Sequence, residues 1–186
     1  PRTDGTLPPR SANSLPPPRR RSDGTRHSHR ICGVVGSHLR VTSILTADGL
    51  ALEARWDDAA ITATAAVVFC HPHPLDGGTM NAPLMQSVAE AMSSSGIHVL
   101  RFNFRGVAGS EGSWDHGVGE IQDVAAAVAA AGLAFPDLPL GIAGWSFGAS
   151  TSLRWQIETA STLAWVGIAP GIRSYRGSSV PEADRL

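Results

Sequence analysis

Short apolar runs alternate with segments of helical spacing between residues 61 and 169, and this alternation limits the possible folds more than any other feature. Short, nearly continuous apolar runs are typical of strands that are covered on both faces of a sheet. The runs that we expect to form such strands are 61–70, 97–104, 138–145 and 163–169. Strands that alternate with helices predict an α/β fold with a mostly parallel sheet and helices on both faces.

Helix signals lie between these runs. Pro83 is typical of the first position of a helix, and we expect that helix to end by Gly96. A second helix is predicted around 121–128 and stops near Gly132, and a third covers 149–157. In an open parallel sheet the functional groups lie at the carboxyl ends of the strands, so the loops there are where a site is expected.

The sheet is expected to begin with a hairpin. Apolar residues recur over 39–45 and 50–54, and these two segments flank Asp48-Gly49, a pair that favours tight hairpin turns. The first two strands should therefore be antiparallel. The folded domain is predicted to span 37–170.

The first 30 residues differ in composition from the rest of the chain. They hold six Pro and seven Arg without apolar periodicity, so no buried core offsets the entropy of ordering them. We expect residues 1–36 to be disordered and residues 171–186 to form a polar tail. Arg19–Arg21 resemble a paired-arginine export signal, but polar residues follow where that signal needs an apolar stretch.

Charge, hydropathy and cysteine content exclude several classes of function. Residues 31–186 hold eight Arg against fourteen acidic residues, which argues against nucleic acid as a partner. No stretch approaches the roughly 20 apolar residues of a membrane span. Cys32 and Cys70 do not form a disulfide framework, and we expect a reducing, cytoplasmic setting. No cofactor is expected.

The sharpest chemical signal is the pentapeptide Gly-Trp-Ser-Phe-Gly at 144–148, where an expected strand meets an expected helix. This is the place of a nucleophile elbow, in which a strained turn projects the Ser146 hydroxyl over the sheet. Gly144 and Gly148 would let neighbouring backbone approach without a clashing Cβ. The alternative is that Ser146 only caps the helix.

A His-Pro-His-Pro segment at 71–74 directly follows the first buried strand, which should supply one oxyanion-hole donor if 144–148 is a nucleophile elbow. The two prolines have no backbone N–H and cannot be that donor. The candidates are the backbone N–H of His73 and then that of Leu75, and we choose His73. The N–H of Phe147 would complete the oxyanion hole.

The same histidines allow a different reading. His71 and His73 are two residues apart and could bind a metal, with Asp115 and His116 as distant partners. No spacing typical of a metal site supports this, and we predict that no metal binds. The simpler reading is that His71 hydrogen-bonds the loop backbone and that Asp115 and His116 are solvated.

Three motifs in this order resemble those of small α/β-hydrolases of the dienelactone-hydrolase-like and prolyl-oligopeptidase-like kind. Besides the two above, residues 105–112 are similar to the Arg-Gly-x-Gly-x-Ser-x-Gly loop of that superfamily, with Ala108 where the pattern has glycine. The resemblance covers 67–170. It implies a serine hydrolase that cleaves small esters or similar acyl compounds through an acyl-enzyme, with Ser146 as the nucleophile. Arg105 is expected to tie loop carbonyls together, or else to bind a substrate carboxylate.

The resemblance also implies an acid and a histidine after the serine, because an imidazole must remove the hydroxyl proton. No histidine follows Ser146, and the only carboxylates after it are Glu158, Glu182 and Asp184. A histidine before the serine could substitute only through a rewired dyad. The candidates are His71, His73 and His116.

The resemblance implies two further strands beyond Ala169, for which 171–186 is too polar and too short. We therefore expect a truncated domain that lacks the last strands of the fold. Its open sheet edge predicts a possible dimer. The alternative to a serine hydrolase is a fragment or a pseudoenzyme that binds a partner or a small ligand.

Overall fold

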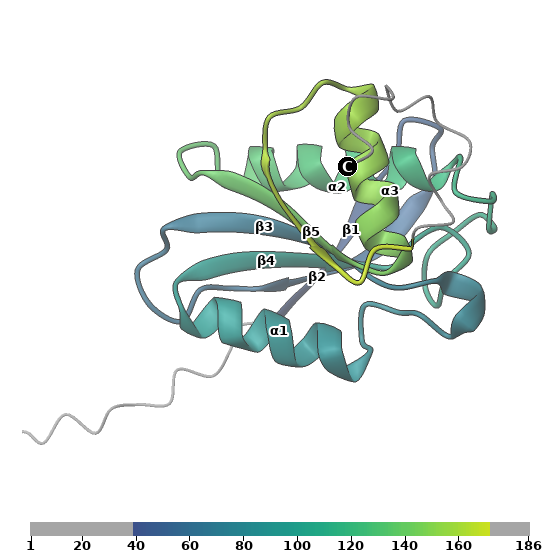
Figure 1. The fold of residues 1–186 in the computed structure, drawn as a ribbon. Helices are drawn as coiled ribbons and strands as arrows, with labels where there is room; N and C mark the ends of the chain where they lie inside the picture. Colours follow the sequence, from purple (N-terminus) through teal and green to yellow (C-terminus); the bar gives the residue numbers. More distant parts are fainter. Residues whose placement is uncertain (1–38, 172–186) are drawn as a thin grey trace, which may run out of the picture. The chain divides into compact units, whose positions relative to one another are not determined.

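The structure, a computed structural model, describes residues 39–171 (Figure 1). The predictions for 1–36 and for the tail concern residues outside this range, apart from Gly171. In chain order the elements are β1 Leu39–Leu45, β2 Ala51–Asp57, β3 Ala65–Cys70, the 3-10 helix η1 Pro74–Asp76, α1 Pro83–Ser94, β4 Ile97–Phe102, α2 Glu120–Ala134, β5 Leu140–Trp145, α3 Phe147–Glu158 and β6 Ala164–Ile168.

The strands of the described part form one sheet in the order β1-β2-β4-β3-β5-β6. The pairs β1/β2 and β2/β4 are antiparallel, whereas β4/β3, β3/β5 and β5/β6 are parallel. The prediction of a mostly parallel sheet entered through an antiparallel hairpin is therefore confirmed. The hairpin turn is closed by Thr46, whose hydroxyl accepts the Leu50 N–H at 2.9 Å.

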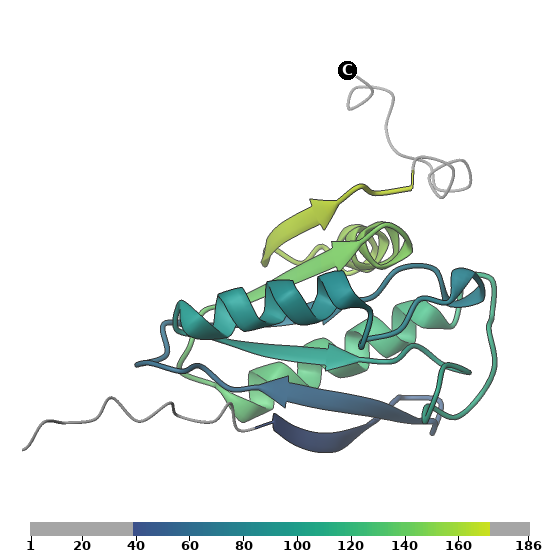
Figure 2. The same ribbon diagram turned by 90° about the horizontal axis from the view of Figure 1, so that it is seen from below.

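Helices cover both faces of the sheet, as predicted. Figure 1 shows α1 below the sheet and α2 and α3 above it, and Figure 2 shows the same arrangement from below. Phe69 belongs to the same buried cluster as Met85 of α1, whereas its neighbour Val68 belongs to the cluster that contains Val124 of α2 and Trp155 of α3. Both β3 residues are fully buried, which is why the sequence there is continuously apolar.

The first buried strand is shorter than the sequence predicts. It begins at Ala65, and Ile61 is 62% exposed. Pairing with β4 starts at Ala65 opposite Ile97, and the chain before Ile97 is the turn that ends α1. Residues 61–64 therefore lie before the paired part of β3, although the Thr64 N–H still donates to the Gly96 carbonyl at 2.8 Å. The strands expected at 97–104, 138–145 and 163–169 are likewise one to two residues shorter at their ends.

The second helix is longer than predicted. It continues through Gly132 to Ala134 and is closed by Phe135, whose N–H donates to the Ala131 carbonyl at 3.1 Å. A Cβ on Gly132 would meet no atom within 4 Å. This glycine is an interior helix residue, and the helix ends two residues beyond it, close to where the sequence predicts.

Two further expectations concern the outer surface. In residues 39–171 no helix has the length and apolarity needed to cross a membrane. Within the same residues β6 pairs only with β5, and Val166 of β6 is 60% exposed. A dimer through this edge stays a prediction.

Candidate active site

Ser146 lies between the end of β5 and the start of α3 with φ 52° and ψ −111°. Positive φ is rare for a residue with a Cβ and stores backbone strain. The Ser146 side chain makes no capping hydrogen bond to α3. The alternative that this serine only caps the helix is therefore not supported, and the strand-turn-helix geometry of an elbow is present.

The two flanking glycines permit this sharp turn. A Cβ on Gly144 would overlap backbone atoms of Gly148 and Ala149. A Cβ on Gly148 would overlap the carbonyl oxygens of Cys70 and His71 at the end of β3. The first turn of α3 thus packs directly on the end of the neighbouring strand, as the sequence predicted from glycine at both flanks.

The elbow is also tied to β6. The Ser146 backbone N–H donates to the Ile168 carbonyl at 2.8 Å. The Ser150 hydroxyl lies 3.3 Å from the Ser146 carbonyl and 3.3 Å from that of Gly171, and it accepts the Gly171 N–H at 3.0 Å. These bonds leave the Ser146 hydroxyl out of the backbone network.

His71 is completely buried at the start of the His-Pro-His-Pro loop. Its Nε2 accepts the Phe104 N–H at 3.0 Å, and its Nδ1 lies 2.7 Å from the Pro72 carbonyl oxygen. The proton of the neutral ring is therefore on Nδ1. Burial lowers the pKa of His71 to about 4. The prediction that His71 hydrogen-bonds the loop backbone is confirmed, and in residues 39–171 no three potential ligands gather around a metal position.

His73 is half-buried and caps η1. Its Nδ1 accepts the Leu75 N–H at 3.2 Å, and its carbonyl accepts the N–H groups of Asp76 at 3.1 Å and Gly78 at 3.0 Å. The Leu75 N–H, the second candidate for the oxyanion hole, is thus already used. The His73 ring lies 5.2 Å from the Phe147 ring, which brings the two chosen donor residues together.

Two buried polar side chains at the end of β4 bind Met80, at the far end of the loop that begins with His71. These two residues were not among the predicted site residues. Asn103 Oδ1 accepts the Met80 N–H at 2.8 Å, and Arg101 Nη1 donates to the Met80 carbonyl at 2.7 Å. Arg101 also forms a bidentate pair with Asp57, at 2.7 and 2.9 Å. The sequence did contain a signal for Arg101 and Asn103, since both are polar residues in an otherwise apolar run. A polar side chain that is buried there requires a hydrogen-bond partner.

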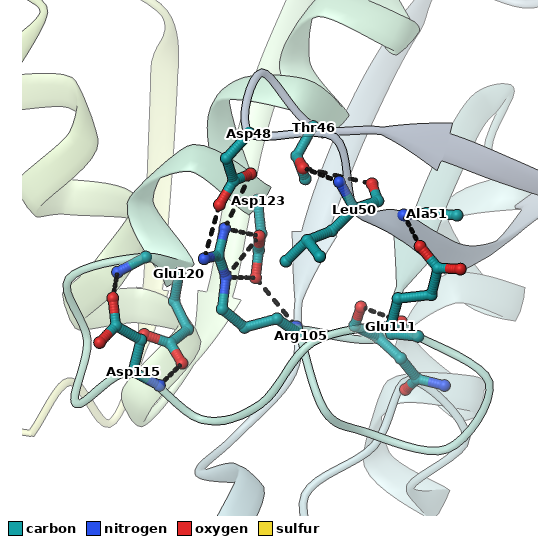
Figure 3. A network of polar contacts seen from close by, with 12 residues as sticks. Thr46, Asp48, Leu50, Ala51, Arg105, Glu111, Asp115, Glu120 and Asp123 are labelled. Carbon is teal, nitrogen blue, oxygen red and sulfur yellow. Dashed lines mark hydrogen bonds and ion pairs between the residues drawn. The ribbon is translucent and has the colours of Figure 1, made fainter.

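Arg105 is structural, but its partners differ from those predicted. Its guanidinium binds two carboxylates, that of Asp123 in α2 and that of Asp48 in the hairpin turn (Figure 3). The Arg105 N–H also donates to Asp123, whose side chain is fully buried. The expectation that Arg105 ties loop carbonyls together was wrong, and these contacts leave no free edge of the guanidinium for a substrate carboxylate.

Ala108 has φ 48°, in the left-handed region that glycine prefers. This explains why a glycine stands there in the pattern that residues 105–112 resemble. The loop keeps its conformation with alanine at the cost of local strain.

The remaining histidines do not complete a catalytic dyad. His116 is exposed, with φ 54°, and its ring lies 6.0 Å from that of Trp114. Between residues 39 and 171 no hydrogen bond joins Ser146 to a histidine, and His71 uses both ring nitrogens for backbone. The rewired dyad is therefore absent from this arrangement.

A family model described as serine aminopeptidase, S33, matches residues 62–185 of the chain. The chain belongs to this family. The expectation of an α/β-hydrolase of the serine-hydrolase type, drawn from the three motifs, is thereby confirmed.

Known proteins agree with this assignment. The crystal structure of XC6422 from Xanthomonas campestris, an α/β serine hydrolase without a lid, is 34% identical with a TM-score of 0.65 over 71% of this chain. The esterase PF2001 from Pyrococcus furiosus is 26% identical with a TM-score of 0.63, also over 71% of the chain. The protein RP471 of Rickettsia prowazekii is 32% identical over 124 residues, or 66% of this chain.

This chain matches only part of each relative. It covers 61% of XC6422, 50% of PF2001 and 52% of RP471. The chain thus spans about half the length of the curated relative that it matches.

Proposed function

We propose that this chain carries the nucleophile and the oxyanion hole of a serine hydrolase that cleaves esters or similar acyl compounds. The observation that carries the proposal is Ser146 at φ 52° in an elbow, with a side chain that caps nothing. Strained backbone at a residue with no structural task for its side chain is typical of a functional position. The Ser146 Oγ would attack the substrate carbonyl and pass its proton to a general base. The acyl–oxygen bond of the ester then breaks, the alcohol leaves with that proton, and the acyl group stays on Ser146 as an acyl-enzyme, for which no cofactor is needed.

The two proposed oxyanion donors are the N–H groups of His73 and Phe147. Phe147 is the first residue of α3, where a helix leaves its N–H without an intrahelical acceptor. The positive end of the helix dipole lies at the same place and would stabilise the developing negative charge. The His73 N–H is the choice for the second donor because the Leu75 N–H already donates to the His73 ring. The adjacent prolines have no backbone N–H.

The general base and the acid are not assigned to residues of 39–171. His71 donates to the Pro72 carbonyl and accepts the Phe104 N–H, so its use as the base would break two hydrogen bonds. The name of PF2001, an esterase, favours ester substrates, and the name of XC6422, a hydrolase without a lid, favours an open site. The family name suggests that an amide is the other acyl compound to test.

A second candidate is a non-catalytic α/β-hydrolase that keeps the site and binds a small ligand. The specific observation in its favour is that, within residues 39–171, no histidine hydrogen-bonds the Ser146 hydroxyl. Without an imidazole the serine hydroxyl is a weak nucleophile. This candidate predicts a folded protein that binds acyl compounds without turning them over.

The test is labelling by a fluorophosphonate probe, followed by turnover of short-chain p-nitrophenyl esters and a p-nitroanilide. The purified 186-residue chain is compared with Ser146→Ala and with Ser94→Ala, a control at an exposed serine near the end of α1. Labelling that persists in Ser94→Ala and disappears in Ser146→Ala supports the proposal. A folded chain that is never labelled, but is stabilised thermally by a non-hydrolysable ester analogue, contradicts it and supports the second candidate.

A further inference from the structure

Three aromatic rings, two from loops and one from the first residue of α3, meet beside the elbow. The Trp114 ring centroid lies 4.8 Å from that of His73 and 5.0 Å from that of Phe147, and the His73 and Phe147 centroids are 5.2 Å apart. Each ring therefore contacts the other two. His73 follows β3, Phe147 follows β5 and Trp114 belongs to the long loop between β4 and α2.

The position of Trp114 is fixed by the loop that carries it. Glu120, whose side chain is completely buried at the start of α2, accepts the N–H groups of Asp115 and Gly117 at 2.8 Å each. Asp115 in turn accepts the Gly119 N–H at 2.9 Å. Figure 3 shows Glu120 and Asp115 in this network. The backbone next to Trp114 is thus held by the buried carboxylate of Glu120 and by the exposed carboxylate of Asp115, so the indole is presented from a rigid support.

Two of the three rings belong to the residues whose backbone N–H groups we assign to the oxyanion hole. We propose that Trp114 is a positioning residue, which holds the His73 and Phe147 side chains and thereby sets the separation of their N–H groups. This inference rests on the function proposed above. Oxyanion donors act only at hydrogen-bonding distance from the developing charge, so a small displacement of either one lowers the rate.

His73 depends on this contact more than Phe147 does. Phe147 is held by α3 and also packs on Phe104, at 5.3 Å between ring centroids. The His73 ring is partly exposed, and its ring contacts are Trp114 and Phe147. Loss of the indole would therefore free the loop at 71–79 first and the elbow second.

The test combines Trp114→Ala, Trp114→Phe and a matched control, Phe135→Ala. Phe135 is also a partly buried aromatic residue with two ring contacts, to Trp56 at 5.1 Å and to His98 at 3.9 Å. His98 is the second residue of β4, so this control lies at the amino ends of the parallel strands. The elbow lies at their carboxyl ends. If Trp114→Ala does not fold, Trp114→Leu, which keeps apolar volume, replaces it.

Hydrogen exchange measured by mass spectrometry is the first readout, because it needs no activity. We expect faster exchange in Trp114→Ala over 71–79 and 146–150, no change over α1, and exchange close to wild type in Trp114→Phe. The Phe135→Ala control should leave both site segments unchanged. Unchanged exchange over 71–79 in Trp114→Ala overturns the inference.

The rate of fluorophosphonate labelling is the second readout. We expect the maximal labelling rate to fall about 10- to 100-fold in Trp114→Ala, as for a misplaced catalytic group, with recovery in Trp114→Phe. A change confined to the probe concentration at half-maximal rate would make Trp114 a wall of the binding site and overturn the positioning role. If the folded wild type is not labelled, the proposed function fails for this chain, whereas the exchange result still decides the role of Trp114.

Discussion

The Nε2 atom of His71 accepts the backbone N–H of Phe104 at 3.0 Å, and the two rings contact each other with centroids 4.8 Å apart. This pair joins the end of β3 to the end of β4 inside the protein. It requires a neutral imidazole, because a protonated ring has no acceptor at Nε2.

The stability of the protein should therefore decrease as the pH falls from about 7 to 4. Burial lowers the pKa of His71 from 6.5 to about 4 in the folded chain, so unfolding takes up a proton in this window. The stabilisation is complete above pH 6.5 and is lost on acidification. Other groups titrate in the same range, so the measurement is the difference between wild type and His71→Asn in urea unfolding. We expect this difference to be about 2 kcal/mol smaller at pH 5 than at pH 7.5.

An equal difference at both pH values would contradict this assignment. Asparagine is the informative replacement because its amide N–H can still donate to the Pro72 carbonyl. The comparison therefore isolates the effect of losing the hydrogen bond from Phe104 and the protonation of the His71 ring.

Ser146→Gly should make the protein more stable. Glycine accepts φ 52° and ψ −111° without the steric strain that a Cβ causes there. We expect a gain of about 1 kcal/mol in the free energy of unfolding, since the relieved strain of roughly 1–3 kcal/mol exceeds the extra entropy of glycine in the unfolded chain. Guanidinium unfolding midpoints of wild type, Ser146→Gly and Ser146→Ala measure it. Equal midpoints for the glycine and alanine variants would show that the elbow is not strained.

Arg105→Ala should destabilise the protein strongly. It leaves the buried carboxylate of Asp123, whose side chain is 0% exposed, without its cation. Breaking a buried pair from one side costs about 3–5 kcal/mol, whereas an exposed pair contributes less than about 1 kcal/mol. Glu158→Gln, which breaks the exposed pair with Arg154, is the control. Similar losses in both variants, measured by urea unfolding, would refute the structural role of Arg105.

Ala108→Gly should be neutral to stabilising, by up to about 1 kcal/mol, because Ala108 has φ 48°. The same substitution at Ala129, an exposed residue inside α2, should destabilise by about 1 kcal/mol. Thermal unfolding of the two variants should therefore shift in opposite directions. A lower melting temperature for Ala108→Gly would contradict the strain seen in the loop.

The alternation of strands and helices and the mostly parallel sheet could be predicted because burial on both faces leaves a continuous apolar run, as at Val68 and Phe69. The ends of elements could not. Whether Ile61 belongs to a strand depends on which segment lies opposite it. Whether a helix ends at Gly132 depends on the packing of the residues that follow this glycine. Both are settled by tertiary partners, which local composition does not show.

In the site, too, features set by local sequence could be predicted, and features set by tertiary contacts could not. Ser146 and its glycines were predictable because the elbow is a local motif in which the backbone itself demands those residues. The carboxylate partners of Arg105 lie 57 and 18 positions away in sequence, and no spacing indicated them. Trp114 gave no signal at all, because its contacts with His73 and Phe147 join two loops and the start of α3, which only the folded sheet brings together.

The hydrogen bond from the Ser146 N–H to the Ile168 carbonyl determines the smallest fragment in which this elbow keeps its conformation. A fragment cut after α3 would retain every residue of the pentapeptide and lose one of the anchors of its turn. Anyone transplanting the motif to another scaffold, or dividing the gene to express a minimal unit, needs the outermost strand as well as the strand and helix that bear the serine.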